Sequence, residues 1–317
     1  MIDFDAAAGQ NRRRSRSLLA IVVALTVVVG LTLDALLQSF AGGVPVVTVL
    51  ALGGTGLAFV AARSFGDRLV LASLRAQPLD PANPEHKQLM NVVHEIAVAS
   101  GLPPPRVAVI PDSAPNALAT GSDPEHATIA VTTGLLEKLD RAETQGVVAH
   151  EMAHVGNRDT RLGVTVAVMV GAIALLADLA WRVRWQARRG GRSAGGEPVI
   201  FLLPLLLLAT ALAPLASRLV AFALSRQREY LADATAVEFT RNPLALASAL
   251  ETISRDRRPT ERGTRGTAHL FFVRPHASRV DEREGAFADW WATHPPIAER
   301  IARLRGMAYQ RHDARDA

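Results

Sequence analysis

The run HEMAH at residues 150–154 combines two histidines and a glutamate at a spacing that suits metal-assisted hydrolysis. On a helix with ~3.6 residues per turn, His150 and His154 project from one face, where both imidazoles can bind one tetrahedral Zn²⁺. Glu151 is turned by roughly 100° around the same helix, so we expect its carboxylate to take a proton from a metal-activated water. The chain has nine histidines. A chance match to this pattern then has a probability on the order of one per cent.

A catalytic zinc needs a third protein ligand besides the two histidines. Residues 225–237, SRQREYLADATAV, carry Glu229 and Asp233 one helical turn apart, so both carboxylates can point the same way. We predict that Glu229 binds the zinc and that Asp233 accepts the N–H of a ligand imidazole. The alternative is a solvated face of charges on this helix. The chain contains no cysteine, which excludes thiolate ligands and disulfides.

The elements that position these residues follow from hydrophobic periodicity and from the end signals of helices and strands. A helix starting near Arg141 carries the two histidines, and residues 225–240 form the helix that carries the carboxylates. The other expected elements are a helix from Pro84 to Gly101, strands at residues 107–110 and 128–132, a helix opened by Asn242 and Pro243, and a helix at residues 297–304. We expect the basic, polar residues 255–268 to form a surface loop.

Apolar segments set this chain apart from a soluble enzyme, since 49% of its residues are hydrophobic. Four segments are each about twenty residues long, enough for a helix to cross a ~30 Å hydrocarbon core. They are residues 18–37, 44–62, 162–180 and 199–217. The first two predict a transmembrane hairpin, and the first is too long for a cleaved signal peptide. The last two form a second hydrophobic hairpin, which either spans the bilayer or enters and returns.

The arginines orient the first hairpin. A cluster at residues 12–16 precedes the first segment, Arg63 and Arg68 follow the second, and the loop between the segments is uncharged. The positive-inside rule therefore places both ends of this hairpin in the cytoplasm. The linker at residues 182–192 is also rich in arginine and would lie outside if the second hairpin spans, against the same rule. The net charge is +5, but the basic residues do not form a face interleaved with aromatic residues, so we expect no nucleic-acid partner.

Five motifs together resemble a known family, the HtpX-type membrane metallopeptidases, which are relatives of the CaaX prenyl endopeptidases. The motifs are HEMAH, NRDT, SRQREYLAD, PNALATG and THPPIAER, and the resemblance extends over roughly residues 10–306. It implies that His150, His154 and Glu229 bind one zinc ion and that Glu151 is the base. It also implies an active site that faces the cytoplasm and degrades misfolded or damaged membrane proteins.

Two further site residues depend mainly on the resemblance. In related enzymes the asparagine of the N-A-x-A-T-G segment lies in an edge strand beside the catalytic helix, which suggests that Asn116 binds substrate here. An exposed edge can accept an extended substrate as an added strand; the alternative is that Asn116 only makes a turn. His294 could donate to the developing oxyanion, or could simply begin the last helix. Leu118 stands where the family often has an aromatic residue and should pack apolarly.

The expected fold is a mainly α-helical membrane protein with a small β-sheet. A helical zincin-like catalytic domain is joined to about four hydrophobic helices. The predicted parts are an anchor hairpin at residues 1–62, a first catalytic part at 63–161, a second hydrophobic hairpin at 162–224, and a second catalytic part at 225–317.

The expected function is zinc-dependent endopeptidase activity in quality control, with one Zn²⁺ per chain. The protein is expected in the bacterial inner membrane as a multi-pass protein, in contact with lipid and with unfolded or membrane-protein substrates. One alternative is a non-enzymatic membrane scaffold with a structural zinc, which would need a fourth protein ligand. The other is a CaaX-type processing protease, although those chains have more spans.

Overall fold

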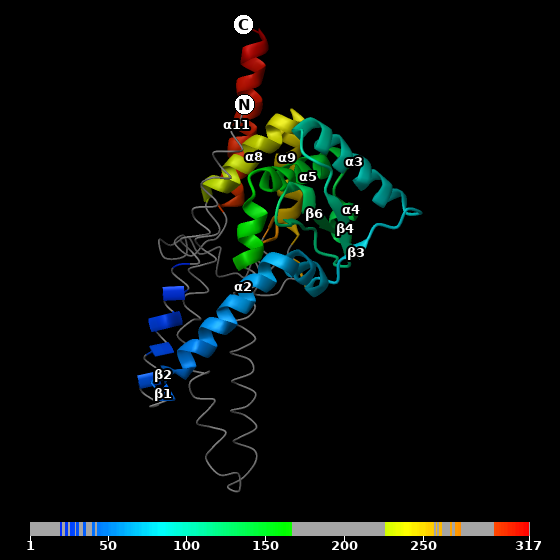
Figure 1. Ribbon diagram of the computed structural model, residues 1–317. Helices are drawn as coiled ribbons and strands as arrows, with labels where there is room; N and C mark the ends of the chain where they lie inside the picture. The colour runs from blue at the N-terminus through cyan, green and yellow to red at the C-terminus, as the bar shows by residue number, and fades with distance from the viewer. Residues whose placement is uncertain are drawn as a thin grey trace.

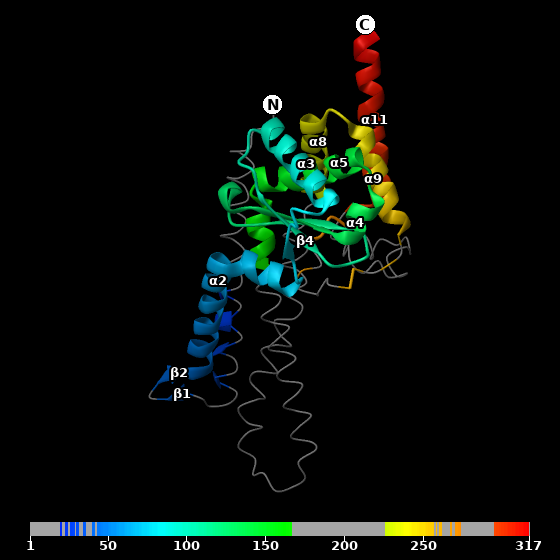
Figure 2. The same ribbon diagram turned by 90° about the vertical axis from the view of Figure 1, so that its right-hand side faces the viewer.

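The computed structural model describes residues 43–166, 226–256, 270–273 and 295–316, with short stretches between residues 20 and 41 and between 258 and 267. Helices and one small sheet form a compact body, from which helix α2 extends on one side and helix α11 on the other (Figures 1 and 2). The fold is mostly helical with a small mixed sheet, as the sequence predicts. The helices are α2 Val46–Ser73, α3 Pro84–Ser100, α4 Thr133–Lys138, α5 Arg141–Gly156, α8 Arg226–Thr240, α9 Pro243–Arg255 and α11 Ile297–Asp316, with a 3₁₀ turn at Pro124–His126.

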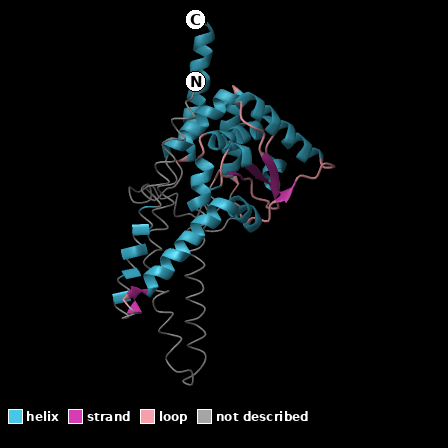
Figure 3. Ribbon diagram, viewed as in Figure 1, coloured by secondary structure: helices cyan, strands magenta, loops and turns pink. Residues whose placement is uncertain are grey.

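The main sheet has four strands in the order β3-β4-β6-β5, formed by Gln77–Pro78, Arg106–Ile110, Thr128–Thr132 and Ala117–Thr120. Strands β4 and β6 run parallel, and the two outer strands pair antiparallel (Figure 3). A two-residue pair, β1 Phe40–Ala41 and β2 Val44–Pro45, precedes α2. Every residue of β5 and β6 is buried, so both faces of this half of the sheet are covered.

Local signals explain where the site-bearing helices begin. Asp140 and Glu143 form a reciprocal capping box at the start of α5, which satisfies two backbone N–H groups that a helix leaves open. The Asn242 side chain accepts the Ala245 N–H at the start of α9. Helix α3 ends at Gly101, whose φ of 68° is a left-handed conformation that glycine adopts without strain. The predicted starts of these helices and both predicted strands are confirmed.

The apolar segments are only partly described. Residues 44–62 fall within β2 and α2, residues 18–37 are described in part, and residues 162–180 only as far as 166. Residues 199–217 lie outside the described residues. Within the described part of the chain no single helix meets the length and hydropathy needed to cross a bilayer. The pair Val46–Ala62 and Ser64–Ser73, bent by 78°, meets them together.

Helix α5 lies between the sheet and the helices α3, α8 and α9, so its position fixes the site. It packs tightly against α9 at Gly146, where a Cβ atom would lie 3.0 Å from the backbone of Leu246. The Glu143 carboxylate also accepts the hydroxyl of Ser248 on α9 at 2.5 Å. The absence of a side chain at Gly146, one turn before His150, therefore allows the two helices to pack closely.

We predict that Gly146→Val destabilises the protein by about 1–3 kcal/mol, because the added side chain overpacks the α5–α9 contact. Gly54→Val is the matched control, since a Cβ atom on this α2 glycine meets nothing within 4 Å. Thermal unfolding of the detergent-solubilised proteins measures the difference. Equal melting temperatures for the two variants would contradict the prediction.

Candidate metal centre

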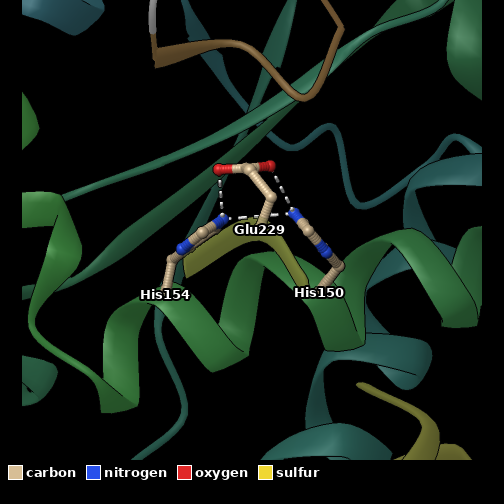
Figure 4. Close-up of side chains that lie close together, drawn as sticks. All are labelled: His150, His154 and Glu229. Atoms are coloured by element: carbon tan, nitrogen blue, oxygen red, sulfur yellow. Dashed lines mark hydrogen bonds and ion pairs between the residues drawn. The ribbon is translucent and has the colours of Figure 1, made fainter. Parts of the chain in front are cut away.

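Three side chains from two helices converge on one point (Figure 4). His150 and His154 of α5 bring their Nε2 atoms to 3.1 Å from each other. Glu229 of α8 places one carboxylate oxygen 3.7 Å from His150 Nε2 and the other 3.7 Å from His154 Nε2. The possible donor atoms of the three residues lie within 4.8 Å of one another. The structure thus brings together the three residues that the sequence predicts as ligands.

The donor set fits a tetrahedral divalent ion. Bonds of ~2.0–2.1 Å at tetrahedral angles separate neighbouring donors by ~3.3–3.4 Å. The observed separations of 3.1 and 3.7 Å lie on either side of this value. Within the described residues, no fourth His, Asp, Glu or Cys joins this group. A set of two imidazoles and one carboxylate is one of those that catalytic zinc sites use with an open fourth position.

The outer nitrogen of each imidazole meets a carboxylate. His150 Nδ1 lies 2.9 Å from Asp233 Oδ1, and His154 Nδ1 lies 3.0 Å from Asp159 Oδ2. Each carboxylate can accept an Nδ1–H, which leaves the Nε2 lone pair directed to the centre of the group. Asp233 therefore lies where the sequence predicts it. Asp159 was missed, although it belongs to the NRDT motif directly after the catalytic helix.

Arg300 of α11 is the other residue that the sequence analysis missed. Its side chain is 1% exposed, and it donates to Asp233 from Nε at 2.8 Å and from Nη2 at 2.7 Å. Its Nη1 lies 3.8 Å from Glu229. This bidentate geometry fixes the Asp233 carboxylate while Asp233 holds His150. The residue ends the THPPIAER motif, but sequence alone does not reveal that its charge is buried.

Burial and neighbouring charges shift the pKa values of the side chains around this group in different directions. Burial lowers the pKa of His150 to about 4, against the opposing effect of Asp233. Burial also acts to lower the pKa of His154, but the hydrogen bond with Asp159 and the charge of Glu229 raise it to about 9. Burial would raise the pKa of Asp233, but the charge and hydrogen bonds of Arg300 lower it to about 2. The carboxylates around the two imidazoles thus favour a positive charge at His154, which a cation at the centre of the group would replace.

Glu151 lies beside this group but outside it. Its carboxylate is buried, which raises its pKa to about 7, and the backbone N–H of Ala119 in β5 donates to it. A carboxylate with a pKa close to neutral can accept a proton and later release it. The charges of His154 and Glu229 both act on its pKa, which places this carboxylate beside the three converging residues.

The two remaining predicted residues have different outcomes. Asn116 directly precedes the edge strand β5, but it is buried, and its side chain binds the backbone of Val273 and the hydroxyl of Thr260. The edge beside it is therefore not exposed, because residues 270–273 of the same chain cover it. The expectation of an open edge was wrong in this respect. His294 lies outside the described residues. Leu118 is fully buried among apolar side chains, as predicted.

Comparison with known proteins decides the family. The model of Peptidase family M48 matches residues 83–308. The chain belongs to peptidase family M48. A protein named "Protease HtpX homolog" from Syntrophobacter fumaroxidans is 41% identical over 300 residues, covering 94% of this chain and 99% of the relative. One with the same name from Thermoanaerobacter pseudethanolicus is 43% identical over 245 residues, covering 76% of this chain and 78% of the relative.

The crystal structure of S. mikatae Ste24p is similar with a TM-score of 0.48 and 17% identity, covering 94% of this chain and 66% of that one. Membership in M48 and the HtpX homologues make this chain a metalloprotease, which implies a metal cofactor. The resemblance to HtpX-type peptidases that the motifs indicate is confirmed.

We predict that Arg300→Met weakens metal binding by about 10–100-fold, because the Asp233 carboxylate that orients His150 loses its buried partner. Competition with a chromogenic chelator measures the zinc affinity. Arg305→Met is the matched control on the same helix, since Arg305 pairs with Glu251 at the surface. If the two variants bind zinc equally well, Arg300 does not support the metal centre.

Proposed function

We propose that this metalloprotease is a zinc-dependent endopeptidase of protein quality control, which hydrolyses misfolded or damaged membrane proteins at the cytoplasmic face of the bacterial inner membrane. The observation that carries the proposal is the convergence of His150, His154 and Glu229 beside the buried Glu151 carboxylate. We assign the three converging residues as ligands of one Zn²⁺ and Glu151 as the general base. Two nitrogen donors and one oxygen donor suit zinc better than the oxygen-preferring calcium or magnesium.

When bound, zinc supplies a Lewis acid and a water of lowered pKa for attack on the scissile carbonyl. The chain's own residues transfer the proton and hold the imidazoles in position. Glu151 accepts the proton of the attacking water on its carboxylate and passes it to the leaving amine nitrogen. Asp233 and Asp159 hold the two imidazoles in place, and Arg300 holds Asp233. His294, outside the described residues, is proposed to donate to the developing oxyanion.

The membrane location is supported by the apolar segments of the sequence and by the surface of α2. Several large apolar side chains of this helix are exposed, as expected for a helix that lies in lipid; they include Val49, Leu50, Leu57 and Val60. Helix continues at residues 159–166, directly after the ligand-bearing α5 and into the third apolar segment. His154 precedes Leu162 by about 12 Å of helix. A site this close to the bilayer can reach loops of unfolded membrane proteins. The division into two catalytic parts and two hydrophobic hairpins belongs to the same proposal.

We predict that Glu151→Gln lowers cleavage of an unfolded membrane protein by about 10²–10⁴-fold, because the amide cannot take up a proton. This variant should keep its zinc, whereas Glu229→Ala should lose it. Gel-based cleavage and elemental analysis of the purified proteins measure the two effects. Wild-type protein treated with a chelator should lose activity and recover it when zinc is restored. Stoichiometric zinc in Glu229→Ala would remove Glu229 from the ligand set.

The natural absence of cysteine allows a direct test of orientation. We predict that Lys87→Cys, exposed on α3, reacts with a membrane-impermeant maleimide in inverted vesicles but not in intact spheroplasts. Val44→Cys, which is exposed in β2 at the start of the second apolar segment, should show the reverse pattern. The basis is the positive-inside rule applied to the first hairpin. Labelling of Lys87→Cys in intact spheroplasts would place the catalytic body on the other side.

A further inference from the structure

The outer edge of β5 presents the backbone groups of alternate residues. The N–H of Thr132 donates to the carbonyl of Asn116 at 2.9 Å, so these two residues form a hydrogen-bonded pair between β5 and β6. In an antiparallel ladder such pairs alternate with pairs whose backbone groups point away from the partner strand. Ala117 and Ala119 are therefore directed outward. The Ala117 N–H already donates to Asn116 Oδ1 at 3.0 Å, and the Ala119 N–H is the donor to Glu151, so the two carbonyls are the groups that an added strand would bind.

Residues 270–273, Leu-Phe-Phe-Val, already lie on this edge as an antiparallel strand. Phe271 is paired with Leu118, and the N–H of Phe272 donates to the carbonyl of Ala117 at 2.8 Å. The Asn116 side chain continues the edge by one residue. Its Nδ2 donates to the Val273 carbonyl at 2.6 Å, and its Oδ1 accepts the Val273 N–H at 3.1 Å. These bonds join main-chain groups of the segment, so they would form with any extended polypeptide in this register.

The segment also touches the metal centre. The ring of Phe272 meets the ring of His150 edge to face, with centroids 4.9 Å apart, and Arg300 lies over Phe272 at 5.0 Å. The rings of Phe271 and Phe272 are both buried, in two apolar clusters on opposite sides of the segment. At the other end of the edge, the Ala119 N–H donates to Glu151. The strand thus lies between the outer edge of β5 and the predicted ligands, where a scissile peptide would have to enter.

We propose that residues 270–273 are an internal competitor of substrate, a strand that an incoming polypeptide must displace from the β5 edge. The inference rests on the proposed function, because it takes this edge to be the substrate site. The segment also sets specificity. A substrate with two consecutive large apolar residues can refill the sites that Phe271 and Phe272 leave, whereas a polar sequence cannot. Apolar stretches of this kind become available when membrane proteins unfold.

The competition has a kinetic signature. A tethered segment acts at a high effective concentration, and a substrate binds with an affinity reduced by the fraction of molecules in which the edge is free. Weakening the segment therefore lowers KM and leaves kcat unchanged. A covalent link that holds the segment on the edge should prevent substrate from binding there while the metal centre stays intact.

The lock can be built from Leu118→Cys with Phe271→Cys. Directly opposed residues of a non-hydrogen-bonded antiparallel pair have Cα atoms about 4.5 Å apart, within the range of a disulfide. We expect the oxidised double variant to cleave an unfolded membrane protein at least about tenfold more slowly than the same protein reduced with a phosphine, with equal zinc content. The cleavage rate of each single variant should not change on oxidation. Equal rates with the cross-link verified by mass spectrometry would overturn the proposal.

The opposite test weakens the binding of residues 270–273 to the β5 edge. It uses Val273→Pro, with Val273→Ala as its matched control. Proline removes the N–H that Asn116 accepts, and the extended conformation before it suits the strand; alanine keeps that N–H. One lost hydrogen bond should lower KM by about two- to tenfold at unchanged kcat. Val273→Ala should have the KM of the wild type. A KM for Val273→Pro equal to or above that of Val273→Ala would contradict the displacement.

A binding measurement separates failure of this inference from failure of the proposed function. Zinc-loaded Glu151→Gln protein is mixed with acetyl-Leu-Phe-Phe-Val-amide or with acetyl-Leu-Ser-Ser-Val-amide. The first peptide should speed hydrogen exchange at the amides of Phe272 and Val273, and the second should not. This result would support displacement even in a protein that cleaves nothing. Unchanged exchange with both peptides would overturn it whatever the enzyme cleaves.

Discussion

The buried ion pair between Arg300 and Asp233 is the interaction on which the geometry of the site depends. It joins α11 to α8, and through the hydrogen bond of Asp233 with His150 it also joins both to α5. Two charges removed from water are costly unless their geometry is good, and here two short hydrogen bonds meet this need. Loss of Arg300 would leave the Asp233 carboxylate buried without its charged partner. Loss of Asp233 would leave the Arg300 charge buried and His150 without the carboxylate that orients its ring. Helix α11 therefore supports the candidate metal centre through Arg300, although it contributes none of the three converging side chains.

The same arrangement explains why one imidazole differs from the other. His150 is enclosed by Asp233, Arg300 and the ring of Phe272, and burial keeps it neutral. His154 is closer to solvent, and its hydrogen bond with Asp159 raises its pKa, which favours the protonated imidazole when no cation is bound. A cation at the centre would take over the role of that proton. Two imidazoles from one helical turn thus depend on carboxylates from different parts of the chain.

Sequence alone predicted the features that depend on local spacing. The pair His150 and His154 follows from the period of one helix, and the caps of α3 and α9 follow from residue type. Glu229 could be chosen because few carboxylates lie on a helix able to face the first. Arg300 and Asp159 could not be assigned, because the burial of a charge depends on tertiary packing. The predicted surface loop shows the same limit, since Thr260 and Thr267 within it are buried.

The packing of the sheet closes both of its faces around β5. One face of the sheet is covered by the core around α3 and α5. On the other face, Val70 and Leu74 of α2 pack with Leu118 and Phe271. Since both faces are closed and β6 occupies the inner edge, the outer edge of β5 is the side of that strand on which another strand can pair, and residues 270–273 lie there. Helix α2 thereby connects the apolar part of the chain to the strand beside the metal centre. Because Val70 and Leu74 pack in one cluster with Leu118 and Phe271, a displacement of α2 on the sheet would change the packing of the Leu118–Phe271 pair at the β5 edge.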